Sequence, residues 1–183
     1  DPLAQLPLLW MAYNLPPGDS DDHYALALLS QILSTGESSR LRERLVNEEQ
    51  AALELIAQVD RRVGPGLFLF GSLPNQGVEV ERLEALIDEE ITRLREEPVS
   101  QRELETVRNQ LLTQVVTQRM TVQNKASQLQ QYALLYGDAA EINAELERYQ
   151  RVTAEDIRRV ARTYLVPENR TVVLAAPARP AGE

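Results

Sequence analysis

The order of strand-like and helix-like segments is the feature that most limits the folds open to this chain. Strand-like segments, indicated by apolar runs, period-two alternation or β-branched residues, occupy four places: Leu6–Tyr13, Ala51–Val59, Leu67–Leu73 and Arg170–Ala176. Two helical segments separate the first two strands, and several helical segments separate the third strand from the fourth. Because strands and helices are grouped rather than strictly alternating, the order predicts an α+β fold with one mainly antiparallel sheet covered by several helices.

Apolar residues at three- and four-residue steps indicate the helices, and capping residues indicate where they begin. The clearest local signal is Ser100-Gln101-Arg102-Glu103, which predicts a capping box at the start of a long helix. Thr153 to Asp156 opens a final helix that ends before Pro167. The other predicted helices are Tyr24–Leu33, a short one containing Leu41 and Leu45, Val78–Arg95, Gln123–Tyr136 and a turn-rich one from Ile142 to Tyr149.

Length and composition bound the kind of protein. A chain of 183 residues suits one well-cored domain, expected over residues 1–176, with the Pro/Ala/Gly-rich residues 177–183 as a tail. A formal net charge of -9 opposes broad electrostatic binding to nucleic acid. The apolar segments are far shorter than the roughly 20 residues that span a bilayer. The absence of cysteine excludes disulfides, thiolate zinc ligands and cysteine nucleophiles, and leaves the cellular compartment open.

The single histidine, His23, offers the sharpest catalytic interpretation of the residues. It follows Asp19, Asp21 and Asp22, so a metal site of one imidazole and carboxylates can be drawn. Acidic residues are also what the N-terminus of a helix favours, and the helix-capping interpretation is preferred. His23 is therefore expected to be a helix-end residue outside any pocket, and an independent metal enzyme built on it is a third, separate hypothesis.

Other charged pairs have simple interpretations as solvated surface charge. Glu48-Glu49 has no basic or hydroxyl partner at a fixed spacing, as paired catalytic carboxylates would need. Arg61-Arg62 and Arg158-Arg159 are isolated basic pairs on an acidic chain. No nucleophile elbow, phosphate-binding loop or dinucleotide fingerprint is present. We therefore expect no catalytic residue and no metal ligand in this chain.

Several segments, in order, resemble the C-terminal half of pitrilysin/insulinase-like (inverzincin) zinc metallopeptidases, such as the mitochondrial processing peptidases. The most specific is Gly36-Glu37-Ser38-Ser39-Arg40-Leu41, which is similar to that family's Gly-x-Ser-Ser-Arg-Leu turn. The helix before this turn also matches. Further matching segments are Gly66-Leu67-Phe68, Gln101–Leu104, Val152–Ile157 and Tyr164–Thr171.

The resemblance implies a half-domain without catalytic function, truncated at its N-terminus. The family holds zinc on an inverted H-x-x-E-H helix plus a distal Glu, and two His ligands cannot come from a chain with one His. Zinc is therefore expected in a partner half. Family members often carry a substrate-contacting Arg and Tyr at positions that align with Val46 and Leu53. These two residues are thus expected to act only as apolar wall of a substrate chamber.

Two functional hypotheses follow from the resemblance. In the first, this half closes a peptide-binding chamber over a zinc-bearing half, in the same polypeptide or in a separate subunit. In the second, the fold serves as a structural or interaction module without proteolysis, like the core subunits of respiratory complexes. We also expect the chain to form homodimers through an unpaired sheet edge, with Leu6–Tyr13 and Thr171–Ala176 as the candidate strands.

Overall fold

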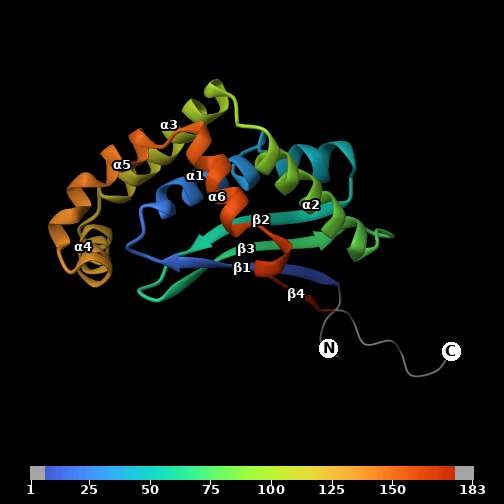
Figure 1. Cartoon of the computed structure of the whole chain (residues 1–183), viewed down its shortest axis with the longest axis horizontal. Coiled ribbons are helices and arrows are strands. Elements are labelled where there is room, and N and C mark those ends of the chain that lie inside the picture. Colours follow the sequence, from blue (N-terminus) through green and yellow to red (C-terminus); the bar gives the residue numbers. More distant parts are fainter. Residues whose placement is uncertain (1–6, 176–183) are drawn as a thin grey trace.

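The sheet of this protein has four strands, as described in a computed structural model that covers residues 7–175 (Figure 1). The strand order is β2-β3-β1-β4, and every neighbouring pair is antiparallel. The strands are β1 (Leu8–Pro17), β2 (Ala52–Asp60), β3 (Pro65–Pro74) and β4 (Arg170–Ala175). This arrangement confirms the predicted α+β class with an antiparallel sheet.

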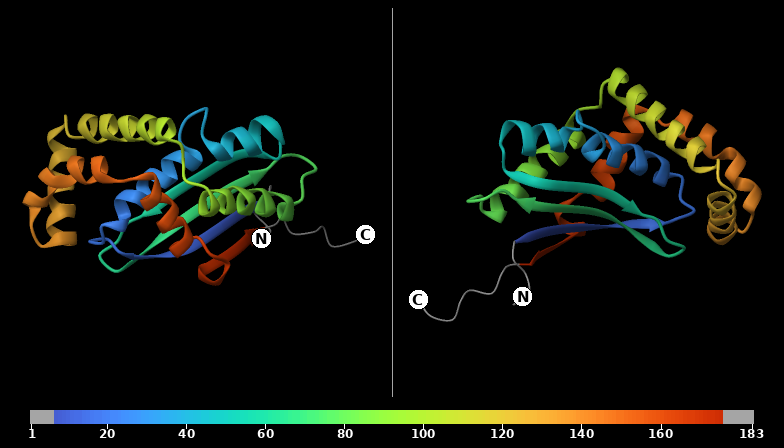
Figure 2. Two further views of the ribbon diagram at one scale, coloured as in Figure 1. Left: turned by 45° about the horizontal axis from the view of Figure 1, so that its top comes forward. Right: turned by 180° about the vertical axis from the view of Figure 1, so that it is seen from behind.

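The α-helices all lie on one side of the sheet, as the two views in Figure 2 show. They are α1 (Asp22–Ser34), α2 (Val80–Glu96), α3 (Gln101–Gln118), α4 (Val122–Tyr136), α5 (Glu145–Arg151) and α6 (Ala154–Tyr164). A π-helical segment η1 (Arg42–Glu48) follows α1, and the 3₁₀ segments are η2 (Ala139–Ala144) and η3 (Pro167–Asn169). The segment α3–α5 extends past one end of the sheet (Figure 1).

The core forms between α1 and the covered face of the sheet, to which the central strands β1 and β3 contribute alternate side chains. Alternate residues of β1 are fully buried on this face, and Phe68 and Phe70 of β3 lie beside Tyr13 and Met11 in the ladder. The aromatic rings of Tyr13 and Phe70 meet edge to face with centroids 5.9 Å apart. Leu26, Leu28 and other buried residues of α1 complete this core.

Two of the predicted strands differ from the structure in their details. Strand β1 continues to Pro17, through residues predicted as a loop, because Asn14 and Leu15 still pair with β3. In β2 a register shift falls between Ala52 and Glu54, so the regular alternation expected over Ala51–Val59 is interrupted and Leu53 is exposed.

Strand β1 is central, so the prediction that it forms an unpaired edge is wrong. It pairs with β3 on one side and with β4 on the other, and the edges of the sheet are β2 and β4. A strand near the chain terminus is not necessarily an edge strand of the sheet. The domain extent of residues 1–176 stays a prediction, and the tail at 177–183 lies outside the described residues.

Candidate functional site

The uncovered face of the sheet carries a continuous group of apolar side chains, which we call the open sheet face. One row of the ladder crosses all four strands through Ile56, Gly71, Trp10 and Val173. Residues directly opposite one another in antiparallel strands project to the same side. Ile56 and Val173 are 43% and 54% exposed. Leu8, Leu69 and Leu73 flank this row on the same face and are half-buried.

Gly71 leaves room for the Trp10 ring in the middle of this face. A Cβ atom on Gly71 would come within 2.9 Å of Trp10 Cζ3 and 3.1 Å of Ile56 Cγ1. Position 71 therefore requires a glycine for steric reasons, because a side chain here would displace the indole. A shallow pocket of about 140 Å³ lies against Trp10, Ile56 and Leu73.

This face can bind another apolar surface, but it supplies no chemistry for catalysis. Contiguous exposed apolar patches on soluble proteins mark interaction sites more often than scattered single residues do. The neighbouring polar side chains on the face are Glu54, Gln58 and Thr171, at its margins in the register. No nucleophile with an adjacent base lies among these three side chains.

His23 lies in the first turn of α1, but it is buried rather than exposed at the helix end. The side chain is only 3% exposed, and Nε2 donates a hydrogen bond to the carbonyl of Pro16 at 3.0 Å. Burial lowers the pKa of His23, and the nearby positive charge of Arg61 also lowers it. The imidazole is therefore neutral at pH 7, with its proton on Nε2, and the expectation that it lies outside any pocket is wrong.

The acidic residues before His23 do not cap α1 with their side chains. Asp21 makes no side-chain capping bond. Asp22 instead accepts hydrogen bonds from Arg159 and from the hydroxyl of Tyr164, both at 2.7 Å, which ties α1 to α6. No group of three His, Asp or Glu side chains within residues 7–175 is placed to hold a metal ion. The donor set of these residues therefore does not fit the zinc site of the resembled peptidases.

The two predicted chamber positions lie on neighbouring segments, Val46 on η1 and Leu53 near the start of β2. Val46 in η1 is partly buried against the core, and Leu53 at the register shift of β2 is 52% exposed. The two segments are joined by a hydrogen bond from the amide of Ala51 to the carbonyl of Leu45, at 2.7 Å. Leu53 is the more accessible of the pair.

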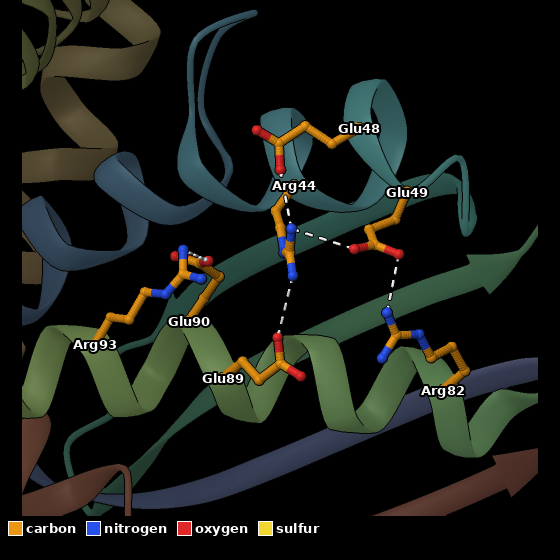
Figure 3. Close-up of polar contacts among 7 residues, drawn as sticks. All are labelled: Arg44, Glu48, Glu49, Arg82, Glu89, Glu90 and Arg93. Carbon is orange, nitrogen blue, oxygen red and sulfur yellow. Dashed lines mark hydrogen bonds and ion pairs between the residues drawn. The ribbon is translucent and has the colours of Figure 1, made fainter.

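Glu48 and Glu49 belong to an ion-pair network between η1 and α2 (Figure 3). Arg44 lies between Glu48, Glu49 and Glu89, at 3.1, 3.2 and 3.3 Å. Arg82 pairs with Glu49 at 2.9 Å and lowers the pKa of that carboxyl. Each carboxylate here faces a guanidinium, so the network joins η1 to α2 and provides no free acid or base.

The basic pairs separate into different roles. Arg62 pairs with Asp60, Arg158 with Glu155 at 2.6 Å, and Arg159 with Asp22 at 2.7 Å. Arg61 differs, because it is half-buried and lines the same cavity as His23. The sequence predicted Arg61 to be surface charge and His23 to lie outside any pocket, and it gave no indication of Tyr132, Tyr136 and Glu145 near them. For the tyrosines the available signal was their four-residue spacing, which places Tyr132 and Tyr136 on one side of α4.

No helix within the described part of the chain is long and apolar enough to cross a membrane. No match was found among curated proteins.

Comparison with solved structures shows the same fold in several proteins. The "Inactive Peptidase Domain of a Putative Zinc Protease" from Bordetella parapertussis is 27% identical, with a TM-score of 0.86, over 98% of this chain and 95% of that one. A protease from Helicobacter pylori is 22% identical, with a TM-score of 0.89, over 95% of this chain. This chain spans only 42% of the Helicobacter protein. One chain of complex III2 from Candida albicans is 13% identical, with a TM-score of 0.82, over 95% of this chain and 43% of that one.

A family model described as "Peptidase M16 inactive domain" matches residues 1–111, which is more than half of the chain. The match confirms the resemblance carried by the Gly36–Leu41 turn and its flanking segments. The chain therefore belongs to the family of peptidase M16 inactive domains.

Proposed function

We propose that this chain is the non-catalytic half of a zinc metalloendopeptidase and that it closes a substrate chamber over a zinc-bearing half. Membership of the inactive-domain family supports the pairing with a catalytic half. The zinc and the general base would come from that half, because the described residues of this chain offer no matching ligand set. This chain would contribute shape, a docking surface and apolar wall.

The open sheet face is the observation that carries the proposal. Its apolar row has no covering element within residues 7–175, although the opposite face carries every α-helix (Figures 1 and 2). Burying apolar side chains such as Trp10, Ile56 and Val173 against a partner would release free energy of about 25 cal/mol per Å². A companion half with a matching apolar surface is therefore the partner that this face suits.

Val46 and Leu53 are proposed as apolar wall of the chamber. Leu53 is exposed at the β2 register shift and is available to a peptide, whereas Val46 is partly buried against the core. Neither side chain can form a hydrogen bond with a substrate. Their contribution would be contact with apolar substrate side chains and exclusion of water.

The test combines this chain with its zinc-bearing half and measures assembly and cleavage of a quenched fluorogenic peptide. Val173→Asp places a charge on the open sheet face, and Val122→Asp places the same charge on the exposed first turn of α4. We expect the first variant to lower both assembly and cleavage by at least ~10-fold, because a buried unpaired charge costs several kcal/mol. The second variant should behave like the wild type, since an acid is favourable near a helix N-terminus.

The outcomes separate the two functional hypotheses. Assembly with zinc-dependent cleavage supports the peptidase half. Assembly through the same face without any cleavage would identify the chain as a structural module. If the zinc-bearing half bound with equal affinity to wild type and to Val173→Asp, the open sheet face would not be the docking surface.

A further inference from the structure

A cavity of about 230 Å³ lies between α1, α3, α4 and α5, on the helical side of the molecule and away from the open sheet face. His23, Arg61, Tyr132 and Glu145 contribute polar groups to its lining. Four glutamine side chains of α3 and α4 also line it, at positions 114, 118, 128 and 131. The cavity is smaller than the ~300–1,000 Å³ typical of sites for drug-sized ligands, so it suits a ligand of one or two residues.

Two buried polar atoms of the lining residues have no hydrogen-bond partner. They are Nδ1 of His23 and the hydroxyl oxygen of Tyr132, and each residue is only 3% exposed. Because His23 donates from Nε2 to Pro16, its Nδ1 carries a lone pair that can accept a hydrogen bond. Leaving such groups unpaired costs about 1–3 kcal/mol each, so a bound ligand or water that pairs with them is favoured.

Arg61 brings a positive charge to the cavity without a balancing carboxylate. Its Nε donates to the carbonyl of Gly18 at 2.5 Å, and a terminal nitrogen donates to the hydroxyl of Tyr136. The guanidinium lies 5.5 and 5.3 Å from the ring centroids of Tyr24 and Tyr136. No ion pair to Arg61 exists among residues 7–175.

The neighbouring arginines Arg119 and Arg148, unlike Arg61, each have a carboxylate partner within residues 7–175. Arg119 pairs with Glu145, the acidic side chain of the cavity, and Arg148 pairs with Glu141. Both local carboxylates are therefore already neutralised. A partly buried guanidinium without a counter-charge keeps a net positive charge, which favours the binding of an anion.

We propose that this cavity binds a carboxylate group, with Arg61 as its charge partner and the Tyr132 hydroxyl as a second donor. A planar guanidinium matches the geometry of a carboxylate, and such hydrogen bonds are about twice as strong as neutral ones. An adjoining amide N–H can donate to His23 Nδ1, and the glutamine side chains can bind further peptide groups. The fitting ligand is the C-terminal carboxylate of a peptide, and a small free acid shares the same chemistry.

This site goes beyond the proposed pairing with a zinc-bearing half and does not depend on it. The cavity is formed by this chain alone, so binding can be measured without a companion. A failure of assembly through the open sheet face would leave the carboxylate site unaffected, and the reverse also holds.

The experiment titrates the full chain with acids and with neutral amides of the same shape, observed by amide NMR. N-acetyl-alanyl-alanine is compared with its C-terminal amide, and propionate with propionamide. We expect the dipeptide acid to bind with a dissociation constant on the order of 1 mM and its amide at least ~10-fold more weakly. Binding by the dipeptide acid alone identifies a peptide end as the ligand, and equal binding by propionate identifies a small free acid. Acid and amide titrating alike would overturn the proposal.

Matched variants test the assignment of residues. Arg61→Gln should weaken binding of the dipeptide acid at least ~10-fold, whereas Arg62→Gln, next to it but paired with Asp60, should change binding less than about twofold. Because Arg61 also anchors Gly18, Tyr132→Phe and Gln118→Glu provide variants with an intact anchor. Tyr132→Phe removes an unpaired hydroxyl without a stability cost and should weaken binding ~2–10-fold, and Gln118→Glu should repel the acid. The site would be refuted if Arg61→Gln and Arg62→Gln bound the dipeptide acid with equal affinity. It would also be refuted if Tyr132→Phe and Gln118→Glu both bound the acid as tightly as the wild type.

Discussion

At the scale of single residues, Arg40 shows how one position of the Gly36–Leu41 turn acts in this fold. Its guanidinium forms two parallel bonds to the Glu103 carboxylate, at 2.7 and 2.8 Å, which joins the turn after α1 to the first turn of α3. The hydrogen bonds to Glu103 raise the pKa of Arg40. A two-pronged pair of this kind is geometrically specific, so the residue serves a structural purpose.

Replacing Arg40 should therefore destabilise the protein. We expect Arg40→Ala to lower the free energy of unfolding by about 1–2 kcal/mol, because both bonds of a partly exposed pair are lost. Arg42→Ala is the control, since its pair with Glu37 is exposed and should contribute less than ~1 kcal/mol. Urea denaturation measures both values. An Arg40→Ala protein as stable as Arg42→Ala would show that the pair contributes nothing.

His23 should make the stability depend on pH. Burial lowers its pKa below the value of 6.5 expected in the unfolded chain, so the unfolded state binds more protons below that pH. The free energy of unfolding should therefore fall as the pH drops from about 7.5 to 5.5. Glu90, whose pKa is raised by burial, acts in the opposite direction and is present in every variant.

The measurement compares urea unfolding of wild type and His23→Gln at these two pH values. Glutamine cannot titrate, and its amide can still donate to the carbonyl of Pro16. The variant should lose less stability than the wild type between pH 7.5 and 5.5. Equal losses in the two proteins would mean that His23 has the same pKa in both states.

At the scale of elements, the capping residues predicted at the beginnings of helices can be compared directly with the hydrogen bonds in the structure. The capping box expected at Ser100–Glu103 is only half formed. The Ser100 hydroxyl accepts from the Glu103 amide at 3.2 Å, but the Glu103 carboxylate binds Arg40 instead of turning back. A complete box forms at α6, where Thr153 and Asp156 satisfy one another, at 3.1 and 2.9 Å.

Removing the complete box should weaken α6 and, through it, the contact with α1. We expect Thr153→Ala to lower the free energy of unfolding by about 1 kcal/mol, the usual cost of losing an N-cap. Thr163→Ala, in the exposed last turn of the same helix, should change it by less than ~0.5 kcal/mol. Thermal and urea unfolding provide the comparison. Similar effects of both substitutions would argue against a capping contribution.

At the scale of the whole molecule, the open sheet face and the β4 edge lie next to each other. Val172, Val173 and Leu174 of β4 are all exposed, and β4 pairs with β1 on only one side. An unpaired apolar edge can recruit another chain. Self-association of the isolated chain thus remains a prediction, now with β4 rather than β1 as its strand.

The expected result is a concentration-dependent rise in the mass measured by light scattering. Val173→Lys should suppress it, because a charge at the edge and on the open sheet face disfavours both routes of association. Val122→Lys, which is distant in the sequence and lies on α4, is the control. A wild-type chain that stays monomeric at millimolar concentration would contradict the prediction.

The sequence by itself determined the class of fold, the position of most helices and the family. These features rest on local information, such as periodicity in Val80–Glu96, capping residues before α6 and the residues of the Gly36–Leu41 turn. Local patterns depend on neighbours a few residues apart, which a single sequence displays directly.

Only the tertiary structure decided which distant residues meet. It placed β1 in the centre of the sheet, brought His23 and Arg61 into one cavity, and directed Glu103 to Arg40. In each case a strand or side chain had several possible partners. The partner it contacts depends on how all the elements bury their apolar faces together. Burial and pairing of charges are properties of the assembled chain, so the spacing of residues could not reveal them.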